Sequence, residues 1–187
     1  MCDVPRLLAR LLPAVAVVAL ASGCDILTEG PEPKPTESPE PLVAAVAGGA
    51  CQLLDFAVIE QVIGVKFEVS ASAQEEATYT CVLQRTTGSL PDLLLIVTPT
   101  TADTPIFRNN LMPQNATLVT GLGKVAFHAV GSAGPGRGPI VEVSWLSANN
   151  RLMTLRITTI GGTTPAEATT LATKLVELAK KVDQTSV

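Results

Sequence analysis

The side chain best suited to acid–base chemistry in this chain of 187 residues is His128, its only histidine. A Ser–His–Asp triad would need an acid to orient the imidazole and a nucleophile beside it, and the sequence has no G-x-S-x-G elbow. A zinc site would have to draw most of its ligands from carboxylates. Because Phe127 and Ala129 flank His128 in a strand pattern, we expect a partly exposed structural histidine. We expect no catalytic residue, metal or cofactor.

Two glycine-rich segments have spacings that could hold an anion. Residues 121–126 read Gly-Leu-Gly-Lys-Val-Ala, and Glu142 follows at about the distance that a dinucleotide-binding fold requires. Residues 126–130 are too short for the helix of that fold, so a tight turn accounts better for these glycines. Residues 131–138 could present Arg137 to an anion, but they lead into a strand, so no helix dipole assists. A mobile hairpin loop therefore accounts better for this segment.

Two of the four cysteines, Cys51 and Cys81, are expected in the folded part of the chain. They lack CxxC spacing and a nearby histidine, which argues against a redox or metal-binding pair. In an oxidising compartment they would form a structural disulfide. It would close a loop of about 30 residues and stabilise the fold by about 3–4 kcal/mol in the chain-entropy model.

The N-terminal segment has the layout of a secretory signal peptide. Arg6 and Arg10 precede an apolar run of ten residues, 11–20, and small residues follow it. A transmembrane helix needs about 20 apolar residues, and Pro13 also interrupts the run. Residues 21–24, Ala-Ser-Gly-Cys, resemble the lipobox of bacterial lipoproteins. That resemblance implies a diacylglyceryl group, with fatty acyl chains such as palmitate, on the thiol of Cys24, removal of residues 1–23 and often acylation of the new amino end.

Ala21 stands where a lipobox usually has leucine, so an ordinary signal-peptidase site with an unmodified Cys24 is the alternative. Cysteine parity favours lipidation, because pairing Cys51 with Cys81 leaves Cys24 without a partner in an exported protein. Each CH₂ group buried in the bilayer contributes about 0.8 kcal/mol to membrane binding. Two or more acyl chains therefore keep a protein on the membrane that a single chain would release. We therefore expect a lipid anchor on Cys24 at the outer face of the cytoplasmic membrane.

Residues 24–50 are expected to form an acidic, proline-rich tether behind this anchor. Residues 30–41 alternate proline with charged residues, which favours extended polyproline II. At about 3.1 Å per residue, residues 25–41 could reach roughly 50 Å. The chain has 13 basic and 17 acidic residues, and much of the acidic excess lies in this segment. The remainder is nearly neutral, which argues against nucleic-acid binding and against electrostatic binding of a polybasic segment to anionic lipid.

Residues 51–187 are predicted to form one α+β domain. Asp55 and Gly64 are suited to begin and end a helix over residues 56–63. Alternation predicts strands over residues 65–72 and 78–85, with Val65, Phe67, Val69 and Ala71 sharing one face. The run 93–97 is apolar on both faces, which predicts a central strand covered on both sides. A short helix over 104–111, with Thr104 as its cap, and strands around 127–129, 141–145 and 153–157 complete this part.

The last helix begins with a capping box at residues 164–167, Thr-Pro-Ala-Glu. Its predicted buried stripe contains Ala168, Leu171, Leu175, Leu178 and Val182, and Lys174, Glu177 and Lys181 are predicted to face water. The order is therefore helix, three strands, helix, three strands, helix. It indicates a two-layer sandwich, in which a mostly antiparallel sheet of about five to six strands carries helices on one face.

Several of these segments together resemble a known group of proteins. Residues 51–64, a later strand cysteine, the segment 121–127 and the alanine- and leucine-rich C-terminal helix resemble actinobacterial secreted lipoproteins of unknown function. The fold of that group is similar to extracellular sensor domains of serine/threonine kinases. The likeness covers residues 51–182 and implies a fold, but no activity. Two features depart from it: many relatives have a second disulfide, and Lys124 stands where an acidic residue is usual.

We expect a non-catalytic lipoprotein whose domain binds a small molecule, an envelope lipid or a protein partner. A structural or assembly subunit of an envelope complex is the alternative, and an envelope hydrolase is a further one. The candidate binding surface combines the glycine loops with the solvent-facing side of the sheet. Its residues are Arg137, Glu142, Ser144, Arg156 and Thr158.

Overall fold

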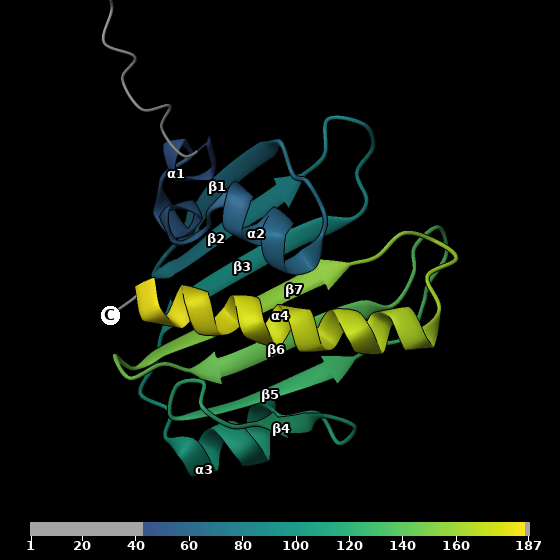
Figure 1. Cartoon of the computed structure of the whole chain (residues 1–187). Coiled ribbons are helices and arrows are strands. Elements are labelled where there is room, and N and C mark those ends of the chain that lie inside the picture. The colour runs from purple at the N-terminus through teal and green to yellow at the C-terminus, as the bar shows by residue number, and fades with distance from the viewer. Residues whose placement is uncertain (1–42, 186–187) are drawn as a thin grey trace, which may run out of the picture. The chain divides into compact units, whose positions relative to one another are not determined.

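The computed structural model describes residues 43–185, which belong to one compact unit, Ser38–Val187. The expected signal peptide, Cys24 and most of the expected tether lie outside the described residues. One sheet of seven strands, in the order β1-β2-β3-β7-β6-β5-β4, forms the centre of this unit (Figure 1). Every neighbouring pair of strands is antiparallel. The structure therefore has the predicted α+β class.

The sheet has more strands than the five to six predicted. The additional strand, β4, has only three residues, too few for an alternating pattern to be visible in the sequence. The strands are β1 Val69–Glu75, β2 Thr78–Gln84, β3 Asp92–Pro99, β4 Thr117–Val119, β5 Val125–Val130, β6 Ile140–Leu146 and β7 Arg151–Thr158.

Two helices, α2 Phe56–Ile63 and α4 Pro165–Thr185, lie on the same face of the sheet (Figure 1). Both begin as the sequence predicts. The Asp55 carboxylate accepts hydrogen bonds from the backbone N–H groups of Ala57 and Val58, and Gly64 ends α2 at a φ of 82°. Thr164 and Glu167 form the capping box of α4: the backbone N–H of Thr164 lies 2.7 Å from Glu167 Oε2.

The main core lies between this helical layer and the sheet. It contains the predicted inner residues of α4, of which Leu171 is only partly buried, and alternate residues of the central strands. Trp145 of β6 is fully buried, and its indole N–H donates to Asp183 Oδ1 at 2.8 Å, which fixes the C-terminal part of α4 on the sheet. Two residues before Cys51, Ala44 and Ala50, are also buried in this core. They belong to the short helix α1 Val43–Val46 and the 3₁₀ turn η1 Gly49–Leu53.

Within the described residues, the opposite face of the sheet is covered at one end only. The segment formed by α3 Thr104–Ile106 and the π-helical turn η2 Phe107–Leu111 packs there, with the Phe107 ring 5.5 Å from that of Phe127. Phe127 and Ala126 are neighbours on β5, and Ala126 belongs to the main core, so Phe127 faces the other way. The expectation of helices on one face only is therefore wrong for this segment. Its N-cap is Asp103, which accepts from the backbone N–H of Ile106, and not Thr104.

Two predictions about the strands are also wrong. β1 begins at Val69, and Phe67 is buried before the strand starts, whereas Val69 is 43% exposed. The register explains the difference, because Ser70 and Ser72 pair with the core residues Leu83 and Cys81 and thus face the helices. β3 is not covered on both sides: Leu94 and Ile96 on its second face are only half-buried, since the helices over β3 lie on the other face.

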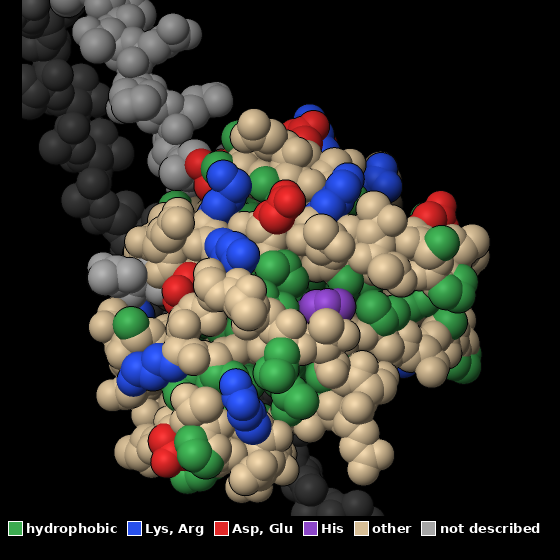
Figure 2. All heavy atoms as spheres, turned by 60° about the horizontal axis from the view of Figure 1, so that its bottom comes forward, with side chains coloured by type: hydrophobic (Ala, Val, Ile, Leu, Met, Phe, Trp, Pro, Cys, Tyr) green, Lys and Arg blue, Asp and Glu red, His purple; other side chains and the backbone are tan. Residues whose placement is uncertain are grey.

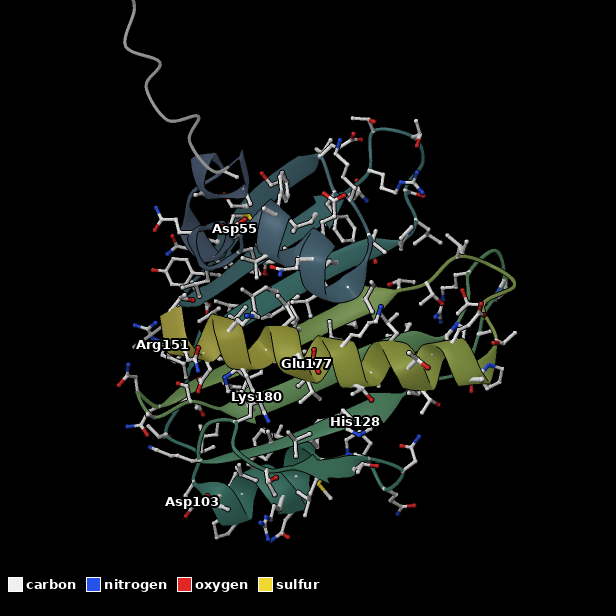
Figure 3. All side chains as sticks on the ribbon, viewed as in Figure 1. Asp55, Asp103, His128, Arg151, Glu177 and Lys180 are labelled. Carbon is white, nitrogen blue, oxygen red and sulfur yellow. A yellow bond between two sulfur atoms is a disulfide. The ribbon has the colours of Figure 1, made fainter. Side chains whose placement is uncertain are left out.

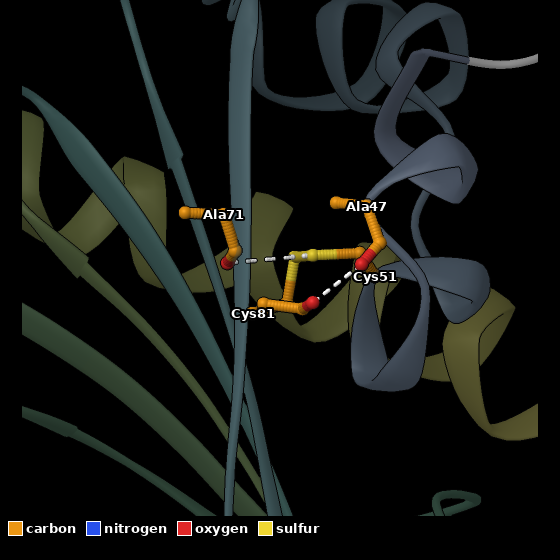
Figure 4. The surroundings of a disulfide bond; sticks show 5 residues. Ala47, Cys51, Ala71 and Cys81 are labelled. Atoms are coloured by element: carbon orange, nitrogen blue, oxygen red, sulfur yellow. Dashed lines mark hydrogen bonds between the residues drawn. A yellow bond between two sulfur atoms is a disulfide. The ribbon is translucent and has the colours of Figure 1, made fainter. Parts of the chain in front are cut away.

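Cys51 and Cys81, the pair that the sequence predicts, are joined by a disulfide with a Cα–Cα distance of 5.0 Å (Figure 4). Both residues are fully buried. Cys51 lies in η1, just before the helix α2, and Cys81 lies in β2. The bond therefore fixes the beginning of the helical layer to the sheet. Beside it, the Ser72 hydroxyl donates to the carbonyl oxygen of Ala47, so η1 and α1 are tied to the edge strand as well.

Candidate functional site

A groove opens on the helical face because the two helices differ in length. α2 has 8 residues and α4 has 21, so they extend about 12 Å and about 32 Å at 1.5 Å per residue. Among residues 43–185, the N-terminal half of α4 consequently has no helix beside it, and the sheet below is open. The resulting groove has a volume of about 810 Å³, within the roughly 300–1,000 Å³ of small-molecule sites.

Three parts of the chain that are far apart in the sequence form this groove. The end of α2 and the following segment supply Ile63 to Lys66 and Glu68. Arg85, just after β2, and Pro91, just before β3, form the second part, and residues between 157 and 174 supply the remainder. Its apolar lining includes Ile63, Val65, Ile157, Ile160 and Leu171. Ile160 is 53% exposed, more than any other large hydrophobic residue in the described part of the chain, so the groove has apolar surface open to water.

The charged groups of the groove are three cations, Lys66, Arg85 and Lys174, and two carboxylates, Glu68 and Glu167. The carboxylates are bonded within the protein. Glu68 Oε2 accepts from the Thr86 hydroxyl at 2.6 Å, and Glu167 belongs to the capping box. Lys174 Nζ donates to the carbonyl oxygen of Ile63 at 3.3 Å, at the end of α2, where the helix dipole favours a cation. Lys174 therefore does not simply face water as predicted, whereas Glu177 and Lys181 are exposed.

Both carboxylates are kept ionised by these hydrogen bonds. The Thr86 hydroxyl, followed by the Thr86 backbone N–H, lowers the pKa of Glu68. The backbone N–H of Thr164, followed by its hydroxyl, lowers the pKa of Glu167. Hydrogen bonds to an ionised carboxylate stabilise that form over the protonated one. At neutral pH the groove thus carries both negative charges, and its three cations leave an excess of one positive charge.

The residues predicted as a binding surface lie elsewhere. Glu142, Ser144, Arg156 and Thr158 share the face of β6 and β7 that is opposite α4, and Glu142 pairs with Arg156 across the strands. Ser144 is 4% exposed, and its hydroxyl lies 2.9 Å from that of Thr154. The structure brings these four residues together on one sheet face but gives them no place in the groove.

Arg137 lies in the loop between β5 and β6. Its backbone forms an isolated β-bridge with Gly134, and a Cβ on Gly134 would lie 2.9 Å from Arg137 Nε. The guanidinium thus packs against its own loop. Its Nη1 atom is buried and makes no hydrogen bond within the described part of the chain.

His128 lies on the face of β5 that α4 covers, because it alternates with Phe127 and pairs with the core residue Val143 (Figure 3). It reaches the surface, where hydrophobic side chains surround it (Figure 2). Its Nδ1 atom has no hydrogen-bond partner among residues 43–185. The same residues contain no group of three or more His, Cys, Asp or Glu side chains placed to hold a metal ion.

Comparison with models of known protein families, with curated proteins and with solved structures gives no match to this chain. Among the helices of residues 43–185, none is both long and apolar enough to cross a membrane.

Local sequence patterns do not reveal the groove. Lys174 reads as a solvent-facing helix residue, and its bond to Ile63 spans 111 residues. The one local signal is Gly64, which ends α2 after 8 residues and leaves the sheet beyond it open.

Proposed function

We propose that this protein is a non-catalytic lipoprotein, anchored through Cys24 outside the cytoplasmic membrane, whose domain binds a small molecule in the groove between α2 and α4. The single observation that carries the binding function is the groove itself. It combines apolar surface open to water with cations at its edge, in a volume of about 810 Å³. Ligand sites are generally concave and mostly apolar with a few polar groups that orient the ligand.

A position in the first turns of α4 allows a sharp test. Thr170 is exposed and lines the groove, whereas the equally exposed Thr169 beside it does not. The hydroxyls of both donate to the backbone carbonyl four residues earlier, so the two positions are matched in environment. Thr170→Trp should fill the groove, and Thr169→Trp should place the same ring in solvent.

Native mass spectrometry of the protein taken from its own membranes should reveal a retained, non-covalent molecule in the wild type and in Thr169→Trp. Thr170→Trp should have lost it. Denaturing spectra of the same samples separate this mass from covalent acyl groups. A wild-type domain that is always empty, or a Thr170→Trp variant that retains the same molecule, would refute binding in the groove.

A further inference from the structure

The hydrogen-bond donors of the groove that no protein group uses belong to cationic side chains, and the surface of the groove that is open to water is apolar. From this combination we infer that it binds an amphipathic anion: a flexible hydrocarbon body with one carboxylate or phosphate group at its end. The inference rests on the proposed binding function and specifies the chemistry of the ligand.

The donors and acceptors of the groove are unequally used. Glu68 is already bonded to Thr86 and lies 3.7 Å from Lys66, and Glu167 is bonded to Thr164. Arg85 has no hydrogen bond or ion pair with any residue of the 43–185 range, although a guanidinium carries several donors in a fixed fork. A ligand anion can therefore take donors that no protein group uses. A ligand cation would have to share carboxylates that already accept hydrogen bonds, and the excess of positive charge in the groove would repel it.

Lys174 adds a second cationic position within the helical layer. Within residues 43–185 its ammonium group makes one hydrogen bond, to the carbonyl oxygen of Ile63, and an ammonium has further donors available. Lys174 is partly buried, so its charge is screened less by salt than that of a fully exposed lysine. Arg85 and Lys174 thus provide two cationic positions in the lining of the groove that a terminal anionic group can contact.

The apolar part of the ligand would rest on the aliphatic side chains of the groove. Ile63 and Ile157 are almost fully buried and form its base, whereas Ile160 is 53% exposed. A bound hydrocarbon would remove the apolar surface of Ile160 from water, which is favourable at about 25 cal/mol per Å². A fully polar anion would leave this surface exposed. An uncharged hydrocarbon would gain nothing from Arg85.

The test uses the full chain with Cys24→Ala, so that no acyl group attached to the protein itself competes for the groove. The probes are laurate, dodecyl phosphate, dodecanol and dodecyltrimethylammonium, which have the same alkyl chain and differ in the head group. Binding is followed through the isoleucine methyl NMR signals. Ile63, Ile157 and Ile160 report on the groove. Ile96 and Ile140 report on the opposite face and serve as internal controls.

Laurate, dodecyl phosphate or both should shift the three groove signals, and the cationic probe should bind at least about tenfold more weakly, the effect of one charge-assisted hydrogen bond. The stronger of the two anions shows whether the groove prefers a carboxylate or a phosphate head group. Arg85→Gln should weaken the anions about tenfold, whereas Arg85→Lys should retain part of the affinity. Arg108→Gln removes the same charge from an exposed site on η2, outside the groove, and should change nothing.

The outcomes distinguish an error in the inferred ligand class from an error in the proposed binding groove. If dodecanol and the cationic probe bind as tightly as the anions, and Thr170→Trp abolishes all binding, the amphipathic-anion inference is wrong and the groove remains a binding site. If the anions bind but Thr170→Trp leaves their affinity unchanged, they bind elsewhere, and the inference is wrong. Failure of every probe to shift the groove isoleucines would also overturn it, while retention of a natural molecule in native spectra would still support the proposed function.

Discussion

Glu167 makes the first turn of α4 sensitive to acid. Hydrogen bonds from the backbone N–H and the hydroxyl of Thr164 lower its pKa in the folded protein. Because the folded pKa lies below the unfolded value, the ionised carboxylate stabilises the fold at neutral pH. This stabilisation is lost as the pH falls below about 4.3 and through the lowered pKa. Glu167→Gln, which can still cap the helix, should therefore lose less stability than the wild type on acidification, as measured by urea unfolding at several pH values.

Glu177→Gln is the matched control for this prediction, because Glu177 is exposed on the same helix and outside the capping box. Glu177→Gln should lose as much stability on acidification as the wild type does. Identical stability–pH curves for wild type and Glu167→Gln would contradict the assignment.

Gly121 and Gly123 lie in the turn that leads into β5. Both have positive φ, 71° and 50°, a region that costs other residues about 1–2 kcal/mol. At Gly121 a Cβ would meet only Lys180 Nζ at 3.8 Å, but at Gly123 it would overlap the carbonyl oxygen of Leu146. Gly123→Ala should therefore lower the free energy of unfolding clearly more than Gly121→Ala. Equal losses for the two variants in urea titrations would show that the overlap is relieved at no cost.

At the scale of elements, the sequence predicts helix boundaries better than it predicts faces. Asp55, Gly64 and the Thr164–Glu167 box act on neighbouring residues, so their types are sufficient. The face of a strand depends on its partner: Val69 alternates with Phe67 in the sequence, yet the register with β2 turns Val69 away from the helices. The groove depends on contacts between still more distant residues. For this reason the sequence predicts a binding surface on β6 and β7 and does not predict the groove.

The disulfide is the main covalent support of the helical layer. It closes a loop with a sequence separation of 30 residues between η1 and β2, which corresponds to about 3–4 kcal/mol in the chain-entropy model. The double variant Cys51→Ala/Cys81→Ala should lose about this free energy of unfolding. Hydrogen exchange should increase first in η1 and β1, which contact each other. Alanine is used because both sites are fully buried and serine would bring in an unpaired hydroxyl.

Reducing agent provides the control for the disulfide variant. It should destabilise the wild type to a similar extent and should not affect the double variant. A wild type whose unfolding midpoint is insensitive to reduction would show that packing of η1 alone holds this part of the domain.

At the scale of the whole molecule, the groove and the proposed anchor have complementary requirements. An amphipathic anion is sparingly soluble and resides in or near a bilayer, so a domain that binds it benefits from attachment to the membrane surface. Residues 25–41 would allow roughly 50 Å of reach. The relationship to actinobacterial lipoproteins remains a prediction from the resemblance of residues 51–64 and 121–127.

The anchor itself can be tested through Cys24. Cells fed a labelled fatty acid should incorporate the label into the wild-type protein, which should fractionate with membranes. Cys24→Ala should remove the label and release the protein, because acyl chains supply the binding energy at about 0.8 kcal/mol per buried CH₂. Cys2→Ala is the matched control: Cys2 lies before the expected cleavage site, so its loss should affect neither label nor location. An unlabelled wild type in the medium, or a mature chain that still begins at Met1, would contradict the anchor. The groove would then have to obtain its ligand from solution.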